Sequence, residues 1–491
     1  MGLSETLANY FDVHNHGSTV RTEVLAGITT FLTMSYIVVV NPSILAENPN
    51  IPGTDGIGIP GYSFGEVQAM LVVVTLLAAA IATLTMAFYA NRPFGQAPGL
   101  GLNAFFAFTV VGALGVPWQT ALAAVFVEGL LFILLTAIGA REAIIKIFPQ
   151  PVKMAVGTGI GLFLAIIGLQ GMGIVVDDTA TLVTLGNLAS NPVAIVAVVG
   201  LFATLILYAA DVPGSILLGI ALTTVLGWVL TQFGIVAPDA GLVVAAGTTS
   251  VSLPALGAVD LVIPGTGSAV TYDITPLAGA FVSGFSNIEA FSFALIVFTF
   301  FFVDFFDTAG TLVGVGQVAG FLDDNGDLPD IDKPLMADAV GTTAGAALGT
   351  STVTTYIESA AGVEEGGRTG LTALVVALLF LASLALVPLA TAVPLYASHI
   401  ALVVIGVVML QNVVDIAWDD ITHTIPAGMT ILVMPFTYSI AYGIASGIIS
   451  YPLVKVAAGE YDDVSAGQWA LAVAFLIYFV VRTSGMLQAQ V

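Results

Sequence analysis

Long apolar runs, separated by short polar stretches, follow one another along almost the whole chain. A membrane-spanning helix needs about 20 mostly apolar residues, and many of these runs reach or approach that length. They lie at about 22–44, 67–90, 118–140, 151–173, 191–209, 213–235, 290–318, 334–349, 369–390, 394–413, 426–438 and 439–457. The pattern predicts an all-α polytopic membrane protein. A last apolar run at 467–483 is expected as an extra C-terminal helix that lies on the surface.

Two further segments are predicted to be broken spans. Residues 92–115, RPFGQAPGLGLNAFFAFTVVGALG, are rich in Gly and Pro and have only a short apolar part. Residues 350–363, TSTVTTYIESAAGV, form a short segment rich in Ser and Thr. Irregular backbone is tolerated at membrane depth only where protein or a cavity satisfies it. With these two segments the chain has 14 predicted spans.

The two halves of the chain repeat weakly. GSILLGIA begins at Gly214 and YSIAYGIA begins at Tyr438, and five of their eight positions coincide. Seven spans per half is an odd number, so the two repeats are expected to be inverted, as in many secondary transporters. A rival count joins 426–457 into one long span and makes 467–483 the fourteenth, which would leave Lys455 outside.

Composition and charge narrow the class. The chain is 58% hydrophobic and 8% charged, whereas a soluble domain carries about 25% charged residues. No cysteine is present, which excludes disulfides and cysteine–zinc chemistry. The net charge of −23 lies largely in loops. It indicates adaptation to high salt, where screening weakens self-repulsion, and it argues against binding to nucleic acid.

The basic residues predict the orientation. The first 21 residues are polar and lack the features of a cleavable signal peptide. With the N-terminus in the cytoplasm, the loop at 236–287, which has no Lys or Arg, falls outside. The basic residues that then fall inside, as the positive-inside rule expects, are Arg21, Arg92, Arg141, Lys146, Lys153, Lys333 and Arg368. Reporters placed after Asp239 and after Asp324 are expected to be external and internal, respectively.

Carboxylates within predicted spans are the candidate functional groups. Each costs about 2.5–3.5 kcal/mol on insertion, so each needs a reason to be there. Asp304 and Asp307 lie three residues apart, on one face of a helix. They cannot easily both ionise at low dielectric, so one is expected to carry a proton. Glu128 also lies in mid-span, where it has either an interior structural role or a gating role.

The broken segments carry groups that suit a flat heterocycle. Glu358 could accept hydrogen bonds from two adjacent N–H donors; the alternative is a buried structural carboxylate or a helix N-cap. Asn103 offers both a donor and an acceptor. Phe105, Phe106 and Phe108 could supply a stacking face or ordinary packing. No nucleophile–base pair or metal-ligand spacing points to an enzyme.

Four stretches of the chain resemble the hypoxanthine/guanine/adenine permeases, the AzgA-like branch of the xanthine/uracil permease family. They are TVRTEVLAGITTFLTMSYIVVVNP (19–42), GLGLNAFFAF (99–108), FVDFFDTAGTL (302–312) and TSTVTTYIESAAGV (350–363). The resemblance implies 14 spans in two inverted repeats, with a short strand and a half-helix in the broken third and tenth spans. It implies a core domain (22–140 and 288–390), a gate domain (151–235 and 394–457) and an extracellular loop (236–287).

The resemblance also implies function. It suggests uptake of adenine, guanine and hypoxanthine across the plasma membrane by proton symport, through an elevator-like alternating-access mechanism. Sodium is the alternative coupling ion, no cofactor is expected, and membrane lipid and a homodimer through the gate domain are the expected partners. The rival functions are an anion transporter of the same fold, which would avoid carboxylates at its site, and a permease selective for xanthine or uracil.

Matching the family motifs position by position assigns the site. Glu358 matches the base-binding glutamate and Asp307 an acidic residue that contacts the base. Asp304 matches a second functional aspartate; both aspartates are candidates for proton coupling, and we favour Asp304 over Asp307 as the proton carrier. The remaining expected substrate-binding residues are Asn103, Phe106 and Thr311. Thr311 departs from the uracil branch, which has a histidine near that position, so proton handling is expected to differ.

Overall fold

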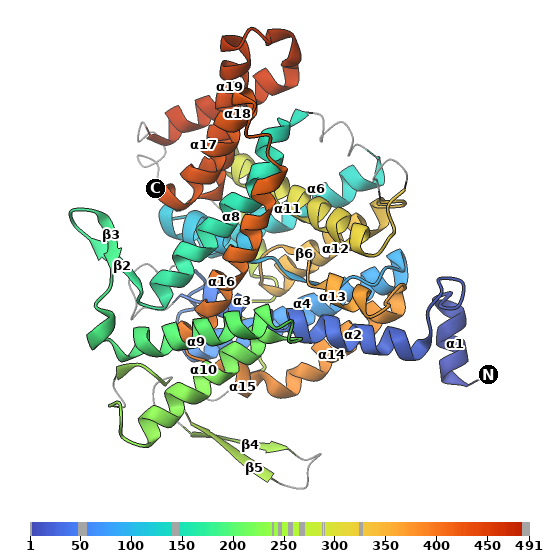
Figure 1. The fold of residues 1–491 in the computed structure, drawn as a ribbon, viewed down its shortest axis with the longest axis vertical. Coiled ribbons are helices and arrows are strands. Elements are labelled where there is room, and N and C mark those ends of the chain that lie inside the picture. The colour runs from blue at the N-terminus through green and yellow to red at the C-terminus, as the bar shows by residue number, and fades with distance from the viewer. Residues whose placement is uncertain are drawn as a thin grey trace. The chain divides into compact units, whose positions relative to one another are not determined.

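The computed structural model describes residues 2–47, 56–139, 147–237, 240–243, 248–253, 259–264, 271–286, 288, 290–323 and 328–483. Helices dominate these residues (Figure 1). The chain divides into two compact units, one formed by Met1–Ala137 and Ile167–Val404 and the other by Ile138–Ile166 and Ile405–Val491. Positions Asp239 and Asp324, chosen above for topology reporters, lie outside the described residues.

The first unit holds most of the helices. They are α1 (Leu3–Tyr10), α2 (Val20–Met34), α3 (Ile37–Leu45), α4 (Phe64–Thr85), α5 (Leu100–Ala104), α6 (Trp118–Ala137), α9 (Pro192–Ala209), α10 (Ser215–Gln232), α11 (Ala290–Val318), α12 (Asp332–Leu348), α13 (Ser359–Glu364), α14 (Gly370–Ala382) and α15 (Val387–Thr391). The second unit holds α17 (Ile421–Thr437), α18 (Ile440–Ala457) and α19 (Ala466–Thr483), while α8 (Gln150–Gly171) and α16 (Leu395–Met409) have residues in both units.

Ten of the described helices are long and apolar enough to cross a membrane, and each coincides with one of the predicted runs. The other four predicted spans form shorter elements. Residues 334–349 and 426–438 correspond to α12 and α17, which have 17 residues each. The two broken segments contain strands and short helices. The structure therefore shows a multi-helix membrane protein. That these four elements also span the membrane stays a prediction.

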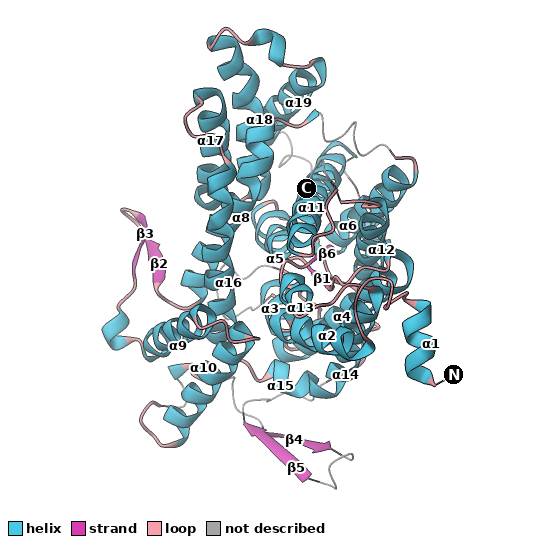
Figure 2. Ribbon diagram, turned by 45° about the vertical axis from the view of Figure 1, so that its right-hand side comes forward, coloured by secondary structure: helices cyan, strands magenta, loops and turns pink. Residues whose placement is uncertain are grey.

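Six short strands form antiparallel pairs in the described part of the chain. They are β1 (Gln96–Pro98) with β6 (Val353–Thr355), β2 (Val175–Asp178) with β3 (Leu182–Leu185), and β4 (Thr248–Leu253) with β5 (Val259–Pro264). The pair β1–β6 is fully buried and lies among α4, α12 and the short helices α5 and α13 (Figure 2). The two short strands predicted in the broken segments are therefore present, and they pair with each other.

The register of β1–β6 brings the two broken segments together. Gln96 faces Thr355 and Pro98 faces Val353. Because the strands are antiparallel, the half-helices that follow them, α5 and α13, leave from opposite ends of the pair. The first half-helix continues from α5 as a π-helical stretch, Phe105–Ala113. Each half-helix thus starts next to a strand of the other segment.

The single long span that the rival count placed at 426–457 is wrong. Helix α17 ends at Thr437, where Tyr438 adopts a left-handed conformation with φ of 52°. The Ser439 hydroxyl then accepts from the Tyr442 N–H and starts α18. The two helices pack as a hairpin because the absent side chains of Gly443 and Gly447 leave room for Met434 and Thr430.

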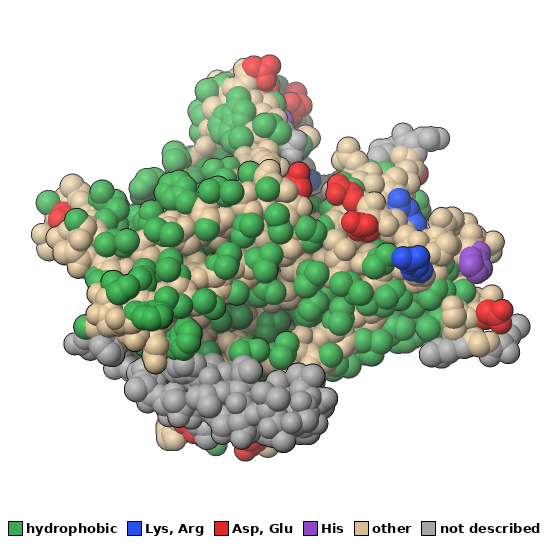
Figure 3. Space-filling model, turned by 60° about the horizontal axis from the view of Figure 1, so that its bottom comes forward, with side chains coloured by type: hydrophobic (Ala, Val, Ile, Leu, Met, Phe, Trp, Pro, Cys, Tyr) green, Lys and Arg blue, Asp and Glu red, His purple; other side chains and the backbone are tan. Residues whose placement is uncertain are grey.

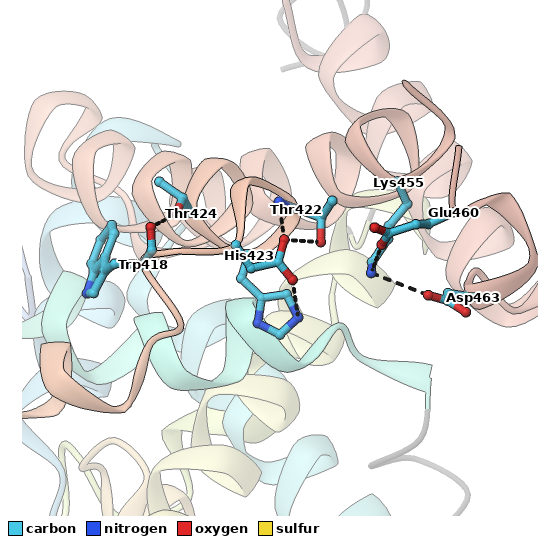
Figure 4. Close-up of polar contacts among 8 residues, drawn as sticks. Trp418, Thr422, His423, Thr424, Lys455, Glu460 and Asp463 are labelled. Carbon is cyan, nitrogen blue, oxygen red and sulfur yellow. Dashed lines mark hydrogen bonds and ion pairs between the residues drawn. The ribbon is translucent and has the colours of Figure 1, made fainter. Parts of the chain in front are cut away.

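Polar contacts mark one end of this hairpin (Figure 4). At the start of α17 the Thr422 N–H and hydroxyl donate to Asp420 at 2.8 and 2.7 Å, which lowers the pKa of the Asp420 carboxyl. At the end of α18 the Lys455 ammonium contacts Glu460 at 2.5 Å and Asp463 at 3.5 Å. These charged groups are expected at the cytoplasmic side, as the positive-inside rule places Lys455.

Apolar side chains cover much of the surface that the described helices expose. On α9 and α10, Phe202 is 61% exposed, Ile206 69% and Leu222 54%. Figure 3 shows hydrophobic side chains spread across the face it presents, with few charged ones among them. A soluble protein rarely exposes apolar patches of this extent, so these helices are suited to face lipid.

Candidate functional site

A network of buried polar side chains surrounds the β1–β6 pair. It draws on α11 and α12, which pack beside β6, and on β1 itself. Its carboxyl groups are Asp304 on α11 and Asp338 on α12, both with no exposed surface. A hydroxyl group contacts Asp304, and a hydroxyl and an amide group contact Asp338. Apolar membrane helices therefore enclose a polar centre at the point where the two broken segments meet.

Asp338 is held by side chains from α11 and β1, which in turn contact β6. The Thr308 hydroxyl of α11 lies 3.0 Å from Asp338 Oδ2 and 2.7 Å from the Thr354 hydroxyl of β6. Gln96 Nε2 of β1 lies 3.4 Å from Asp338 Oδ1 and 3.1 Å from Thr355 Oγ1. Asp338 and Gln96 were not among the residues predicted from the sequence. Asp338 could have been recognised as a carboxylate within the short apolar run that forms α12.

Asp304 lies one turn before Thr308 on the same helix. The Thr342 hydroxyl of α12 lies 3.3 Å from Asp304 Oδ2. The second oxygen of Asp304, Oδ1, has no hydrogen-bond donor, and neither has either oxygen of Glu128 on α6 among the described residues. The Glu128 and Asp304 carboxyl groups nevertheless lie close enough to interact with each other. The mid-span glutamate of α6 therefore belongs to this network.

Glu358 is the last of the three residues between β6 and α13. The Tyr36 hydroxyl, at the start of α3, donates to Glu358 Oε1 at 2.6 Å. Glu358 stands at the N-cap position of α13, but its side chain makes no capping hydrogen bond there. The residue is partly exposed, which leaves its carboxylate accessible for a further donor.

Two tyrosines accompany Glu358, and the sequence analysis missed both. The Tyr356 hydroxyl donates to the Pro98 carbonyl of β1 at 2.6 Å, and its ring centroid lies 6.4 Å from that of Tyr36. Tyr36 lies in the first of the quoted family stretches, and Tyr356 lies two residues before Glu358. Local hydropathy does not distinguish such tyrosines from packing residues, so only the tertiary contacts identify them.

Asp307 lies between the buried network and Glu358. Its charge interacts with those of Asp304 and Glu358, and it is only partly buried. Thr311 follows one turn later on α11 and is also partly exposed. Asp304 and Asp307 thus have different environments, since one is enclosed and the other reaches accessible space. This difference matches the separate roles predicted for them, which stay predictions.

Asn103 and Phe106 belong to the other half-helix. Asn103 on α5 is fully buried, and its side-chain oxygen and nitrogen both lack a partner among the described residues. Phe106 is also fully buried, with its ring 6.4 Å from that of Phe300. Phe105 packs edge-on against the same ring at 4.9 Å. In this structure the two phenylalanines pack against α11, and base stacking by Phe106 stays a prediction.

The described residues contain no group of three or more His, Asp or Glu side chains arranged to hold a metal ion. Hydroxyls, amides and carboxyls make up the site. Such a set can bind a neutral polar heterocycle through hydrogen bonds and can carry protons.

Comparison with known proteins relates this arrangement to a family. The model of the xanthine/uracil permeases, described as a permease family, matches residues 21–446. A putative permease of Methanocaldococcus jannaschii is 43% identical over 478 residues, which cover 97% of this chain and 99% of that protein. Adenine permease AdeP of Escherichia coli is 39% identical and covers 96% of both chains. Guanine/hypoxanthine permease PbuG of Bacillus subtilis is 38% identical, covering 96% of this chain and 99% of its own.

Solved structures share the fold at low sequence identity. The transmembrane domain of the cyanobacterium bicarbonate transporter BicA superposes with a TM-score of 0.56 at 15% identity, covering 87% of this chain and 97% of that one. This likeness concerns the fold alone. The full-length relatives and the matched family model establish that the chain belongs to the xanthine/uracil permease family.

Proposed function

We propose that this protein imports purine nucleobases, namely adenine, guanine and hypoxanthine, by proton symport. Relatives at 38–39% identity over nearly the whole chain are named adenine and guanine/hypoxanthine permeases. The observation that carries the proposal is Glu358. Its partly exposed carboxylate lies at the junction of strand and half-helix, next to the partly buried Asp307.

The chemistry of this site suits a purine. Two adjacent N–H groups of a base can donate to one carboxylate, and such charge-assisted bonds are about twice as strong as neutral ones. Asp307 and the Tyr36 hydroxyl provide further polar contacts around the base. A xanthine- or uracil-selective permease is the closest alternative, because the family includes such carriers.

An anion transporter is the second alternative, since BicA shares the fold. An anion needs exposed backbone N–H groups or positive charge at its site. Here the strand–half-helix junction carries the Glu358 carboxylate, and Asp307 on α11 lies close enough to interact with it. Like charges at such short range would repel the anion, and this favours a neutral substrate.

The remaining parts of the proposal concern the transport cycle. We propose two inverted seven-span repeats, a core domain that moves against a gate domain in an elevator-like cycle, and a cytoplasmic N-terminus in the plasma membrane. A homodimer through the gate domain and adaptation to high salt belong to the same proposal. Sodium is the alternative coupling ion.

Uptake of labelled hypoxanthine tests the substrate. Unlabelled adenine, guanine and hypoxanthine are expected to compete, whereas xanthine, uracil and bicarbonate are not, and a protonophore is expected to abolish accumulation. Competition by uracil and xanthine alone would reassign the substrate class. Uptake that persists with a protonophore and depends on sodium would identify sodium, and not the proton, as the coupling ion.

A further inference from the structure

We propose that Glu128 and Asp304 share one proton. The hydrogen bonds of Thr342 to Asp304 and to β6 change with the presence of this proton. In this way the pair couples proton movement to the base site. The inference rests on the proposed function as a proton symporter. It assigns a role to Glu128, which lies on α6 and belongs to neither broken segment.

The surroundings of the pair favour a shared proton. Glu128 and Asp304 have no exposed surface, and their three unpartnered oxygens receive no donor from the described residues. A carboxylate can only accept hydrogen bonds, whereas a protonated carboxyl donates one. The contact between the two groups therefore becomes a hydrogen bond only when one of them carries a proton. Two facing carboxylates without that proton would repel each other in a low-dielectric interior.

Neighbouring charges do not offer another solution. The acidic groups that face the pair are Asp338 on α12 and Asp307 on α11, and both carry the same sign. The ion pairs of Lys333, His423 and Lys455 lie elsewhere. Gln96, fully buried beside Asp338, adds an unpartnered acceptor oxygen to the same region. The region is thus rich in acceptors and short of donors, which a proton can remedy.

Close packing isolates the pair from water. Gly129, next to Glu128, lets the backbone of α12 approach α6, because a side chain there would meet the Thr343 backbone at 2.9–3.1 Å. One turn further along α6, the Phe132 ring packs against Phe301 at 5.7 Å and Phe305 at 5.6 Å. Phe301 and Phe305 lie three residues before and one residue after Asp304 on α11.

Thr342 connects the pair to β6. Its hydroxyl accepts from the Val353 N–H at 3.0 Å and can donate its single hydrogen to the Val353 carbonyl at 2.9 Å or to Asp304 Oδ2 at 3.3 Å. A charged Asp304 would draw this hydrogen away from β6, since bonds to ionised acceptors are stronger. A protonated pair would leave it on Val353, which is the shorter contact here. Loss of the proton therefore loosens the strand that leads to Glu358.

Infrared spectroscopy of the purified protein without substrate tests the shared proton directly. Near neutral pH the wild type is expected to show a protonated-carboxyl stretch that shifts in heavy water. Glu128→Gln should lose this component of the spectrum. Glu66→Gln should keep it, because Glu66 is an ionised capping group at the start of α4. An unchanged spectrum in Glu128→Gln would overturn the proposal, whether or not the protein transports purines.

Transport assays test the coupling. The readout is the ratio of ΔpH-driven accumulation to counterflow in vesicles, which cancels differences in the amount of folded protein. In Glu128→Gln and Thr342→Val, ΔpH should no longer drive accumulation although counterflow continues, so the ratio should fall. Thr342→Ser retains the hydroxyl and should keep the wild-type ratio. A parallel fall of both rates in Glu128→Gln and Thr342→Val would indicate a structural role and overturn the coupling. Absence of purine counterflow in the wild type would instead refute the proposed function.

Discussion

At the scale of single residues, the carboxylate of Glu358 is the main candidate for contact with the base. Glu358 is partly exposed and accepts a hydrogen bond from the Tyr36 hydroxyl. We predict that Glu358→Gln weakens base binding roughly tenfold to a hundredfold, since a charged hydrogen bond contributes about 1.5–3 kcal/mol. Binding to the purified protein by calorimetry is the measurement, with Glu364→Gln, on an exposed residue, as the control. Equal affinity of both variants for all three purines would remove Glu358 from the site.

The fully buried carboxylate of Glu23 on α2 has a structural role. It accepts from the N–H groups of Arg368, Thr369 and Thr372 and from the Thr372 hydroxyl, all at 2.6–3.3 Å. These donors form the start of α14, where a negative charge is stabilised by the helix dipole.

Glu23→Gln should therefore lower the thermal midpoint of unfolding in detergent, since it loses at least one charged bond of about 1.5–3 kcal/mol. The matched control is Glu5→Gln, on an exposed residue of α1. Identical midpoints would show that the α14 cap does not contribute to stability.

At the scale of elements, both copies of the repeated sequence motif pack in the same manner. Gly219 of α10 faces Thr204 of the preceding helix α9, and Gly443 of α18 faces Met434 and Thr430 of the preceding helix α17. Small residues at such positions allow membrane helices to approach closely. This common hairpin supports the proposed internal repeat, which further depends on the relative orientation of the halves.

The α9–α10 hairpin leads to a stability prediction. The two helices interlock reciprocally, since Gly200 also faces Thr223. Gly219→Leu should destabilise the protein by about 1–3 kcal/mol through overpacking, seen as a lower midpoint in fluorescence-detected gel filtration. Gly428→Ala, in open space on α17, should keep or slightly raise the midpoint. Equal behaviour of the two variants would contradict the close packing.

At the scale of the whole molecule, the distribution of basic residues predicts the topology. The chain has no cysteine, so single cysteines are clean probes. Thr184→Cys, on the exposed strand β3, should react with a membrane-impermeant maleimide in intact cells. Asp419→Cys, before α17, should react only after permeabilisation, because it lies at the same hairpin end as Lys455. The reverse pattern would invert the orientation and remove the support drawn from the positive-inside rule.

The sequence by itself determined the class of the molecule and the positions of its main helices. Apolar runs and Gly/Pro-rich interruptions are local properties of the chain, so they predicted the ten long helices and both strand-containing segments. A carboxylate within an apolar run is equally local, and it indicated Asp304, Asp307, Glu358 and Glu128.

Only the tertiary structure decided which of these groups meet. The partners of Glu358 and Gln96 are Tyr36, 322 residues away, and Asp338, 242 residues away. From the sequence alone, Glu128 could have either a structural or a gating role. Its position next to Asp304 follows from the packing of α6 against α11 and α12. The break at Tyr438 likewise follows from a left-handed backbone that hydropathy does not encode. Hydropathy specifies burial segment by segment, whereas side-chain pairing depends on which buried faces pack together.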